Sequence, residues 1–530
     1  MTQDQNFADR SRPTSLHAQH EDPAHSQTPS VKPTIRTVLL LTCILVQFID
    51  SYNGSSMFAA IPPISEQLGI PTNQSVWLIS AYQLTFASLL LSSGSFVDLF
   101  GPKYIFISGL LIMSFCALGA GFTRSRVPLI ILRALQGVGA ALNVPAAVAF
   151  IIRLCPEPAL QARVLTLFSA ISGIGATVGL FIGAVFVTEA SWPWVFYFSS
   201  IFTFALACVV FVLAPIHLAR PHVDTSKGRL RTGLKRVDTA GIFLLTAALI
   251  LFIFAVTSGS IDGWGSARVI APLVISVVLA VAFGVWESRI DEQVAAVPPS
   301  MWRHKNFAIL AVLGLLPIMW WAAVQFLFSW LWQQVYGYSP IEVAVHFLPL
   351  LLVTFVIGPL ADALHKKVPL KRVILAGQML LLVGTILLPF ANTRGKYWRF
   401  AVPAFIIGSS GNLLVFTTAN VALFANIPPR IAGTAAAIFN SANQVGSAAG
   451  AAIIASIEAG VESGHGGPTR FDGRAAGFWF LFALETIAAG AVLATMKYEP
   501  PAGAEKGGGA DAGELVAVEA GDRMGAPPEK

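Results

Sequence analysis

Charged residues are scarce in this 530-residue chain. Asp, Glu, Lys and Arg make up 12% of it, whereas hydrophobic residues make up 55%. Soluble domains are nearer a quarter charged, and a single soluble core cannot hide so large an apolar excess. Apolar runs of about 20 residues recur along the chain, which is the length that a bilayer core requires of a helix. The scarcity of charge therefore excludes an ordinary soluble protein and predicts an all-α integral membrane protein.

Cysteine is also scarce, and the sequence lacks patterns typical of metal sites and enzyme active sites. The four cysteines fall in or beside apolar runs without the spacing of a zinc site or a disulfide framework. The sequence contains no nucleophile elbow and no phosphate-binding loop. The net charge is +6, but the basic residues are spread over short loops and do not gather as a nucleic-acid groove requires. We therefore expect no metal, no cofactor, no nucleic-acid partner and no enzymatic activity.

About fourteen apolar runs lie between residues 37 and 496. Each should form a helix, because backbone groups in lipid must be hydrogen-bonded within their own segment. With both termini in the cytoplasm, the inner loops carry about twice as many basic residues as the outer loops, as the positive-inside rule requires. The cluster Arg394, Lys396 and Arg399 in a predicted outer loop is an exception. We predict cytoplasmic termini, with the plasma membrane as the first choice and the vacuolar membrane as the second.

Two turns between apolar runs share a Gly-x-x-x-Asp pattern followed by basic residues. The first holds Gly94, Asp98, Gly101 and Lys103, and the second holds Gly358 and Asp362. The repeated turn indicates two related halves, and it resembles the loop signature of the major facilitator superfamily of secondary transporters. The resemblance implies a gating role, in which Asp98 would contact a helix N-terminus or a basic group across the interface between the halves. A solvated loop aspartate is the alternative.

The distance between the two turns exceeds what six spans fill, whereas six spans and an inserted pair fit it. This resemblance therefore divides the chain into two six-helix bundles with an insert. The predicted parts are a disordered cytoplasmic tail at 1–36, a bundle at 37–214, a basic cytoplasmic loop at 215–237, an inserted helix pair at 238–287, a linker at 288–306, a second bundle at 307–496 and a disordered tail at 497–530.

Spans four and five carry further motifs. The run from Leu132 to Ala141 includes Arg133 and resembles the superfamily's span-four motif, in which the arginine is linked to proton transfer. An arginine inside an apolar helix usually faces the bundle interior, although it can also snorkel to the interface. Span five resembles the antiporter motif of drug:proton families, with Leu180 where the motif has proline. Its glycines also suit ordinary close helix packing; they are Gly175, Gly179 and Gly183.

Span one carries a deep carboxylate, Asp50. The family's span-one acid would fall at Asn53, one turn later on the same helix face. A buried carboxyl group favours its neutral form, so Asp50 could take up and release a proton as access alternates. We therefore rank Asp50 first as the proton-coupling residue. A structural acid that is hydrogen-bonded to a neighbouring helix is the alternative.

The resemblance implies that spans one, four, nine and twelve line a central cavity. Span nine is rich in aromatic residues, which could hold an apolar or cationic solute or could instead face lipid. The candidate cavity residues are Asn53, Gln136, Asn143, Trp320, Trp321, Gln325, Asn412 and Asn420.

Span thirteen, with Asn440, Asn443, Gln444, Gly446 and Gly450, resembles that of fourteen-helix drug:proton antiporters and narrows the resemblance to that branch. Span one, from Phe48 to Ile64, is similar to a fungal group associated with aminotriazole and boron resistance and low-affinity ammonium transport. The resemblance implies a monomeric carrier in the lipid bilayer, with protons and a small molecule as its partners. Its function would be proton-coupled export of a small solute or xenobiotic by alternating access. Uptake or facilitated movement of a polar solute such as ammonium or borate is one alternative, and a non-transporting sensor is another.

Overall fold

The computed structural model describes residues 32–215, 238–291, 295, 297–425, 427, 432–464, 467 and 469–497. Every regular element in these ranges is a helix, which confirms the predicted all-α fold class. The predicted tails and the basic loop at 215–237 lie outside the described residues except at their edges. The first helix already begins at Pro33, where the missing N–H of proline is not needed for helix hydrogen bonding.

The helices fall into three runs along the chain. The first run comprises α1 (Pro33–Leu68), α2 (Thr72–Ser75), α3 (Trp77–Phe100), α4 (Pro102–Phe122), α5 (Arg126–Leu154), α6 (Pro158–Glu189) and α7 (Pro193–Leu213). The second run comprises α9 (Thr239–Asp262) and α10 (Ala267–Glu287). The third run comprises α11 (Phe307–Leu313), α12 (Leu316–Trp330), α13 (Pro340–His346), α14 (Leu348–His365), α15 (Leu370–Leu387), α16 (Val402–Ala425), α17 (Ala432–Gly464) and α18 (Asp472–Thr495). Two π-helical segments, η3 (Leu331–Val335) and η6 (Tyr397–Ala401), extend α12 and precede α16.

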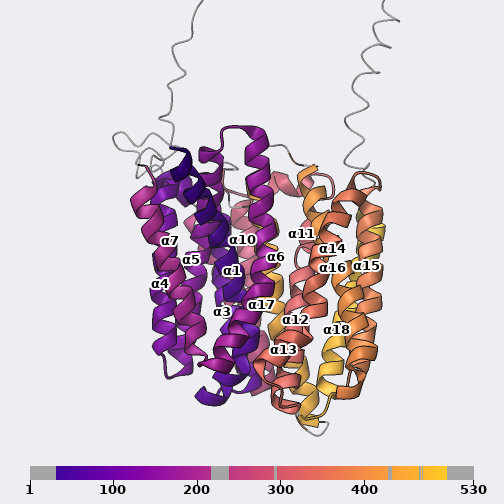
Figure 1. The fold of residues 1–530 in the computed structure, drawn as a ribbon. Helices are drawn as coiled ribbons and strands as arrows, with labels where there is room; N and C mark the ends of the chain where they lie inside the picture. The colour runs from indigo at the N-terminus through magenta and orange to yellow at the C-terminus, as the bar shows by residue number, and fades with distance from the viewer. Residues whose placement is uncertain are drawn as a thin grey trace, which may run out of the picture.

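Thirteen helical segments of the described ranges are long and apolar enough to cross a bilayer. A fourteenth is added if the two parts of α3, which are bent by 57°, count as one span. Both described chain ends lie at the upper end of the bundle in Figure 1. An even number of crossings is needed to bring them to one side, so α3 counts as a span and the prediction of about fourteen helices is confirmed.

The helices form two groups that lie side by side (Figure 1). The helices from α1 to α7 make up the left group, and those from α11 to α18 make up most of the right group. α9 packs against α3 and α17, which also pack against each other and so connect the two groups. The assignment of residues 238–287 as an insert between two six-helix halves stays a prediction.

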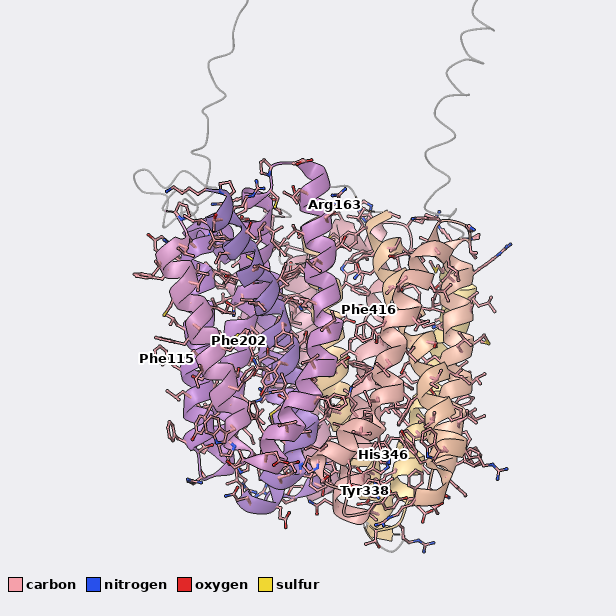
Figure 2. All side chains as sticks on the ribbon, in the orientation of Figure 1. Phe115, Arg163, Phe202, Tyr338, His346 and Phe416 are labelled. Atoms are coloured by element: carbon pink, nitrogen blue, oxygen red, sulfur yellow. The ribbon has the colours of Figure 1, made fainter. Side chains whose placement is uncertain are left out.

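The outer surface of the bundle is apolar. On α10, Val274, Val277, Val278 and Val281 are each more than half exposed. Phe115 of α4 points outward at the left edge of Figure 2. Monomeric soluble proteins rarely expose contiguous apolar surface of this extent, whereas lipid covers it without a free-energy penalty.

The close approach of α1 and α6 depends on glycine. These two helices make the most extensive contact of any helix pair in the described structure. A Cβ atom on Gly175 would lie 2.8 Å from the Phe48 carbonyl oxygen, and one on Gly179 would lie 2.8 Å from the Tyr52 Cα. Gly183 meets Ser56 in the same way one turn later. The predicted glycine stripe therefore lies against the face of α1 that carries Phe48, Tyr52 and Ser56, and its spacing of four residues matches one helix turn.

We predict that Gly179→Ala destabilises the protein, because the new methyl group would force α1 and α6 apart. Overpacking of this kind typically costs about 1–3 kcal/mol. Thermal unfolding of the purified protein in detergent measures the effect. Gly173→Ala is the matched control on the same helix, since its Cβ would make an ordinary contact 3.4 Å from Thr354. Equal midpoints for the two variants would contradict the prediction.

Candidate functional site

The candidate site begins with Asp50, which lies in the middle of α1 and is buried. The hydroxyl group of Tyr82, on α3, donates a hydrogen bond to Asp50 Oδ1. Tyr82 is also buried, at 2% exposure. Reasoning from the sequence missed this tyrosine. The sequence offered only the neighbouring polar residues Ser80 and Gln83 in an otherwise apolar span, which did not single out Tyr82.

Arg133 connects three helices from its position on α5. Its Nε donates to the Leu78 carbonyl oxygen of α3 at 2.8 Å, and its Nη2 donates to the Asn53 carbonyl oxygen of α1 at 3.1 Å. The side chain is fully buried, and these bonds point it inward, so it does not snorkel to the interface. The buried guanidinium group is thereby hydrogen-bonded at several of its five donors, as burial of a charged group requires.

The amides predicted for the cavity extend this cluster. Gln136 Oε1 accepts a hydrogen bond from Arg133 Nη1 at 3.3 Å, one turn further along α5. Asn53 donates to the Ile49 carbonyl oxygen and accepts a hydrogen bond from the Ser199 hydroxyl group of α7 at 2.9 Å. Four of the predicted site residues therefore belong to one buried network, namely Asp50, Asn53, Arg133 and Gln136.

Tyr82 contacts both the guanidinium group of Arg133 and the carboxyl group of Asp50. The Arg133 guanidinium carbon lies 4.6 Å from the ring centroid, and the hydroxyl group of the same ring contacts Asp50. Burial favours the neutral form of a carboxyl group, whereas a nearby guanidinium group favours its anion. These two effects therefore oppose each other at Asp50.

The turn-motif residues lie away from this cluster. Gly101 adopts φ +86° between α3 and α4, a conformation that glycine tolerates, and Lys103 donates to the carbonyl oxygen of Ala214, which caps the C-terminus of α7. Asp98 interacts electrostatically with Arg153 of α5, a helix of its own group. A Cβ atom on Gly94 or on Gly358 would meet nothing within 4 Å.

The second copy of the motif contributes Asp362, which is exposed near the end of α14. The roles of both copies in gating stay predictions.

Three of the predicted cavity residues contact partners within their own helix group. The Trp320 indole donates to Thr385 of α15 at 2.9 Å, and Asn412 donates to the Pro317 carbonyl oxygen at 2.9 Å. Asn143 faces α4, where its amide nitrogen lies 3.0 Å from the Met113 sulfur. The remaining three are Gln325, which is buried, and Trp321 and Asn420, which are partly buried. The cavity roles of all six stay predictions.

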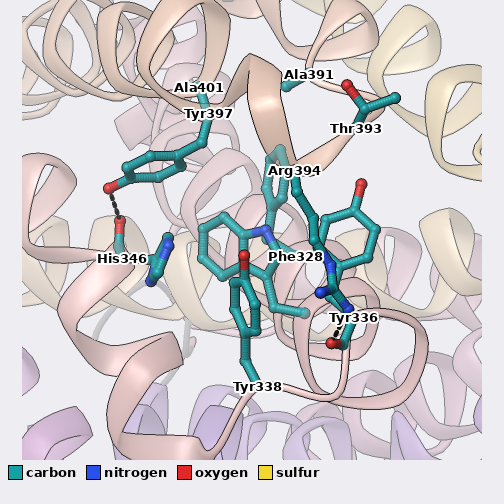
Figure 3. Close-up of a pocket in the computed structure, with 10 residues that line it drawn as sticks. Phe328, Tyr336, Tyr338, His346, Ala391, Thr393, Arg394, Tyr397 and Ala401 are labelled. Atoms are coloured by element: carbon teal, nitrogen blue, oxygen red, sulfur yellow. Dashed lines mark hydrogen bonds between the residues drawn. The ribbon is translucent and has the colours of Figure 1, made fainter.

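A small pocket lies at the lower end of the bundle, where Tyr338 and His346 are labelled, opposite Arg163 at the upper end (Figure 2). Aromatic side chains line it, and it has room for about one water molecule. The Arg394 guanidinium carbon lies 5.2 Å from the Tyr336 ring centroid and 5.4 Å from that of Tyr338. Figure 3 shows Arg394 bonded to the Tyr336 carbonyl oxygen and Tyr397 bonded to that of His346.

Aromatic rings lie beside each of the three basic residues that break the loop-charge pattern. Arg394 lies against the Tyr336 and Tyr338 rings, while Lys396 and Arg399 lie over the Phe400 ring at 5.9 Å and 5.4 Å. Aromatic faces attract cations electrostatically.

Within the described residues, no group of three or more His, Cys, Asp or Glu side chains could hold a metal ion.

We predict that Arg133→Lys lowers stability markedly, because an ammonium group cannot reproduce the planar set of bonds to α1, α3 and Gln136. Each lost hydrogen bond to a charged group is worth about 1.5–3 kcal/mol. Arg126→Lys is the matched control, since Arg126 is exposed and bonds only the side chain of Gln74 among the contacts described. Thermal midpoints of the two purified variants measure the difference. A midpoint for Arg133→Lys equal to that of the control would contradict the prediction.

The chain is similar in sequence to known membrane transporters. The sequence model of the family described as Major Facilitator Superfamily matches residues 43–451. The puromycin resistance protein pur8 of Streptomyces alboniger is 31% identical over 430 residues, which cover 80% of this chain and 82% of that protein. The low affinity ammonium transporter of Saccharomyces cerevisiae is 29% identical over 403 residues, which cover 74% and 76% of the two chains.

Solved structures agree at the level of the fold. A peptide transporter POT crystallised in complex with sulfate aligns with a TM-score of 0.62 at 15% identity, covering 86% of this chain and 94% of that chain. The predicted resemblance is confirmed by these findings. The family match extends over most of the chain, and the helices form the fourteen-span bundle that the sequence predicted. The chain therefore belongs to the Major Facilitator Superfamily and is a multi-pass membrane transporter, not an enzyme.

Proposed function

We propose that this transporter exports a small solute or xenobiotic in exchange for protons, with Asp50 as the residue that carries the proton. The observation that carries the proposal is the buried contact of Asp50 with Tyr82, which in turn lies under Arg133. An ionisable side chain inside a membrane bundle is expensive to bury and marks an ion or proton pathway. Among the similar proteins, a cephamycin export protein and a multidrug transporter also favour export.

The arrangement of the two helix groups supports alternating access. Hydrogen bonds between the groups join Gln333 to the Ala59 carbonyl oxygen at 3.4 Å and Ser80 to the Ala448 carbonyl oxygen at 3.1 Å. α6 also packs against α13, near the lower end of Figure 1. Near the C-terminal ends of α3 and α14, a Cβ atom on Gly94 or Gly358 would meet nothing within 4 Å. We infer a state in which the lower side is closed and the upper side is the more open one.

The orientation follows from the loop charges. With both termini in the cytoplasm, the upper end of Figure 1 is the inner side and the closed lower end is the outer side. The state inferred above is then inward-facing, which is the state in which an exporter takes up its solute. We propose the plasma membrane as the location.

Facilitated movement of ammonium or another small polar solute is the second candidate. The yeast relative named as a low affinity ammonium transporter favours it, and so does Leu180 at the place of the proline in the antiporter motif. The two candidates differ in whether solute movement requires Asp50. Membership of a transporter family favours either of them over a non-transporting sensor.

The decisive experiment uses inside-out vesicles with an acidic interior. We expect puromycin or a lipophilic cation such as tetraphenylphosphonium to collapse the proton gradient, and we expect Asp50→Asn to abolish this flux because it removes the exchangeable proton. Asp262→Asn is the matched control, since Asp262 only forms an exposed ion pair with Arg268 at 3.5 Å.

Ammonium and borate complete the panel of solutes. Solute movement without proton movement, or proton flux that survives Asp50→Asn, would overturn the coupling proposal. Asp50-independent movement of ammonium would favour the second candidate.

A further inference from the structure

Three charged side chains lie together where α17 ends and α18 begins. Glu458 and Glu462 lie one turn apart on α17, and Arg474 lies in the first turn of α18. Arg474 Nε lies 3.1 Å from Glu458 Oε1, and Arg474 Nη1 lies 3.8 Å from Glu462 Oε1. Gly473 allows this approach, because a Cβ atom there would lie 2.7 Å from the Glu458 carbonyl oxygen. This cluster, the Glu458–Glu462–Arg474 triad, was not found by reasoning from the sequence.

The triad is buried and its charges do not balance. The side chains of Glu458 and Arg474 are 3% and 4% exposed, so water reaches neither to a useful extent. Two carboxylates face one guanidinium group, which also donates a hydrogen bond to the Arg470 carbonyl oxygen at 3.0 Å. If both glutamates were ionised, one negative charge would stay uncompensated in a low-dielectric interior, which is strongly unfavourable.

Among the described residues, neither oxygen of Glu458 accepts a hydrogen bond, and Oε1 has only its ion pair with Arg474. Glu458 Oε2 is buried, and no described residue forms a hydrogen bond with it. A buried acceptor without a donor is unfavourable, and a proton on this carboxyl group would remove the excess charge. The burial of Glu458, the excess negative charge of the triad and the oxygen without a hydrogen bond therefore all favour a bound proton.

Within the part of the chain that the structure describes, the charged groups named below lie near the triad but do not balance its charge. On α18, Asp472 pairs with Arg470 at 3.1 Å on the exposed surface, and Glu485 lies about three turns further along the helix. From the segment after α12, Tyr336 interacts electrostatically with Arg474. Arg394 is the next cation beyond it, and it lies over the Tyr336 ring.

We propose that the Glu458–Glu462–Arg474 triad is a second proton-binding site, separate from Asp50. α18 begins at the lower end of the bundle in Figure 1, so the site opens to the side opposite the described chain ends. Glu462 provides the access, because its side chain is 13% exposed while that of Glu458 is 3% exposed. A proton arriving from that side reaches Glu462 first and can pass to Glu458 beside the shared arginine.

Two residues of the triad lie on α17, which packs against α3 of the left-hand group. α17 packs against α3, where Ser441 donates to the Ala87 carbonyl oxygen at 2.9 Å. α3 carries Tyr82, the partner of Asp50. A proton that alters the packing of α17 on α18 therefore acts on a helix that packs against α3. Proton binding by the triad does not require the proposed antiport, whereas its use in transport rests on that function.

Infrared difference spectroscopy of the full-length protein in lipid nanodiscs tests the proposal. A protonated buried carboxyl group gives a carbonyl stretching band that disappears as the pH rises. We expect wild-type protein to show such a band and Glu458→Gln and Glu462→Gln to lose or shift it. Asp472→Asn is the matched control and should leave it unchanged, because Asp472 is half exposed. A pH-dependent band that is identical in both glutamate variants and the wild type would overturn the proposal, as would the absence of any such band.

A second measurement covers the case in which a glutamine variant folds poorly. The pH dependence of the thermal midpoint reports protons that the folded protein binds more tightly than the unfolded chain. Such a proton stabilises at low pH, and its contribution is lost as the pH rises through the titration of the folded state. We expect Arg474→Gln to extend this stabilisation to higher pH, because removing the cation strengthens proton binding to the two carboxyl groups. A pH profile unchanged from that of the wild type would contradict the proposal.

The spectroscopic result is independent of transport. The band assigned to the triad should persist in Asp50→Asn protein, since that residue lies on α1 in the other helix group. If vesicle flux fails while the band persists, the antiport proposal falls and the site stands. If flux depends on Asp50 while the band is insensitive to both glutamates, the triad proposal falls and the antiport proposal stands.

Discussion

The burial of one guanidinium group constrains the whole left-hand helix group. Arg133 is inaccessible to solvent, so its positive charge must be met by protein atoms, and these come from α1 and α3. The same requirement fixes Tyr82 beneath the guanidinium group and Asp50 beyond it. In the proposed mechanism, this carboxyl group alternates between its protonated and ionised forms as the helices move. The proposed transport chemistry would then depend on a constraint of membrane folding.

Close helix packing makes this constraint effective. The glycines of α6 bring its backbone against α1 within van der Waals distance, so α1 cannot shift without moving α6. α6 in turn packs on α13 of the other group, and α3 packs on α17. The cluster around Asp50 is thus connected to both of the contacts that the proposed change of access would break. Large interfaces of this kind have discrete arrangements and do not deform continuously.

Much of this arrangement could be predicted from the sequence, because long apolar runs predict membrane-spanning helices. Asp50 and Arg133 were recognisable as rare charges inside such runs, and Gly179 by its place in a glycine stripe. Tyr82 was not, because a tyrosine in an apolar span is ordinary and only the fold brings it to Asp50. Arg474 resembled a loop charge because it is the third residue of its helix, and its burial depends on the distant Glu458. Partners far apart in sequence are set by tertiary packing, which spacing does not reveal.

The account depends most directly on the link between protonation of Asp50 and solute binding. That link is measured by the affinity of the purified protein for puromycin, or for whichever solute drives proton flux, over a series of pH values. Because coupling of two ligands is reciprocal, exchange requires the solute affinity to change with pH. The account predicts a marked pH dependence in the wild type and loss of its larger part in Asp50→Asn. The same pH dependence in both proteins would contradict it.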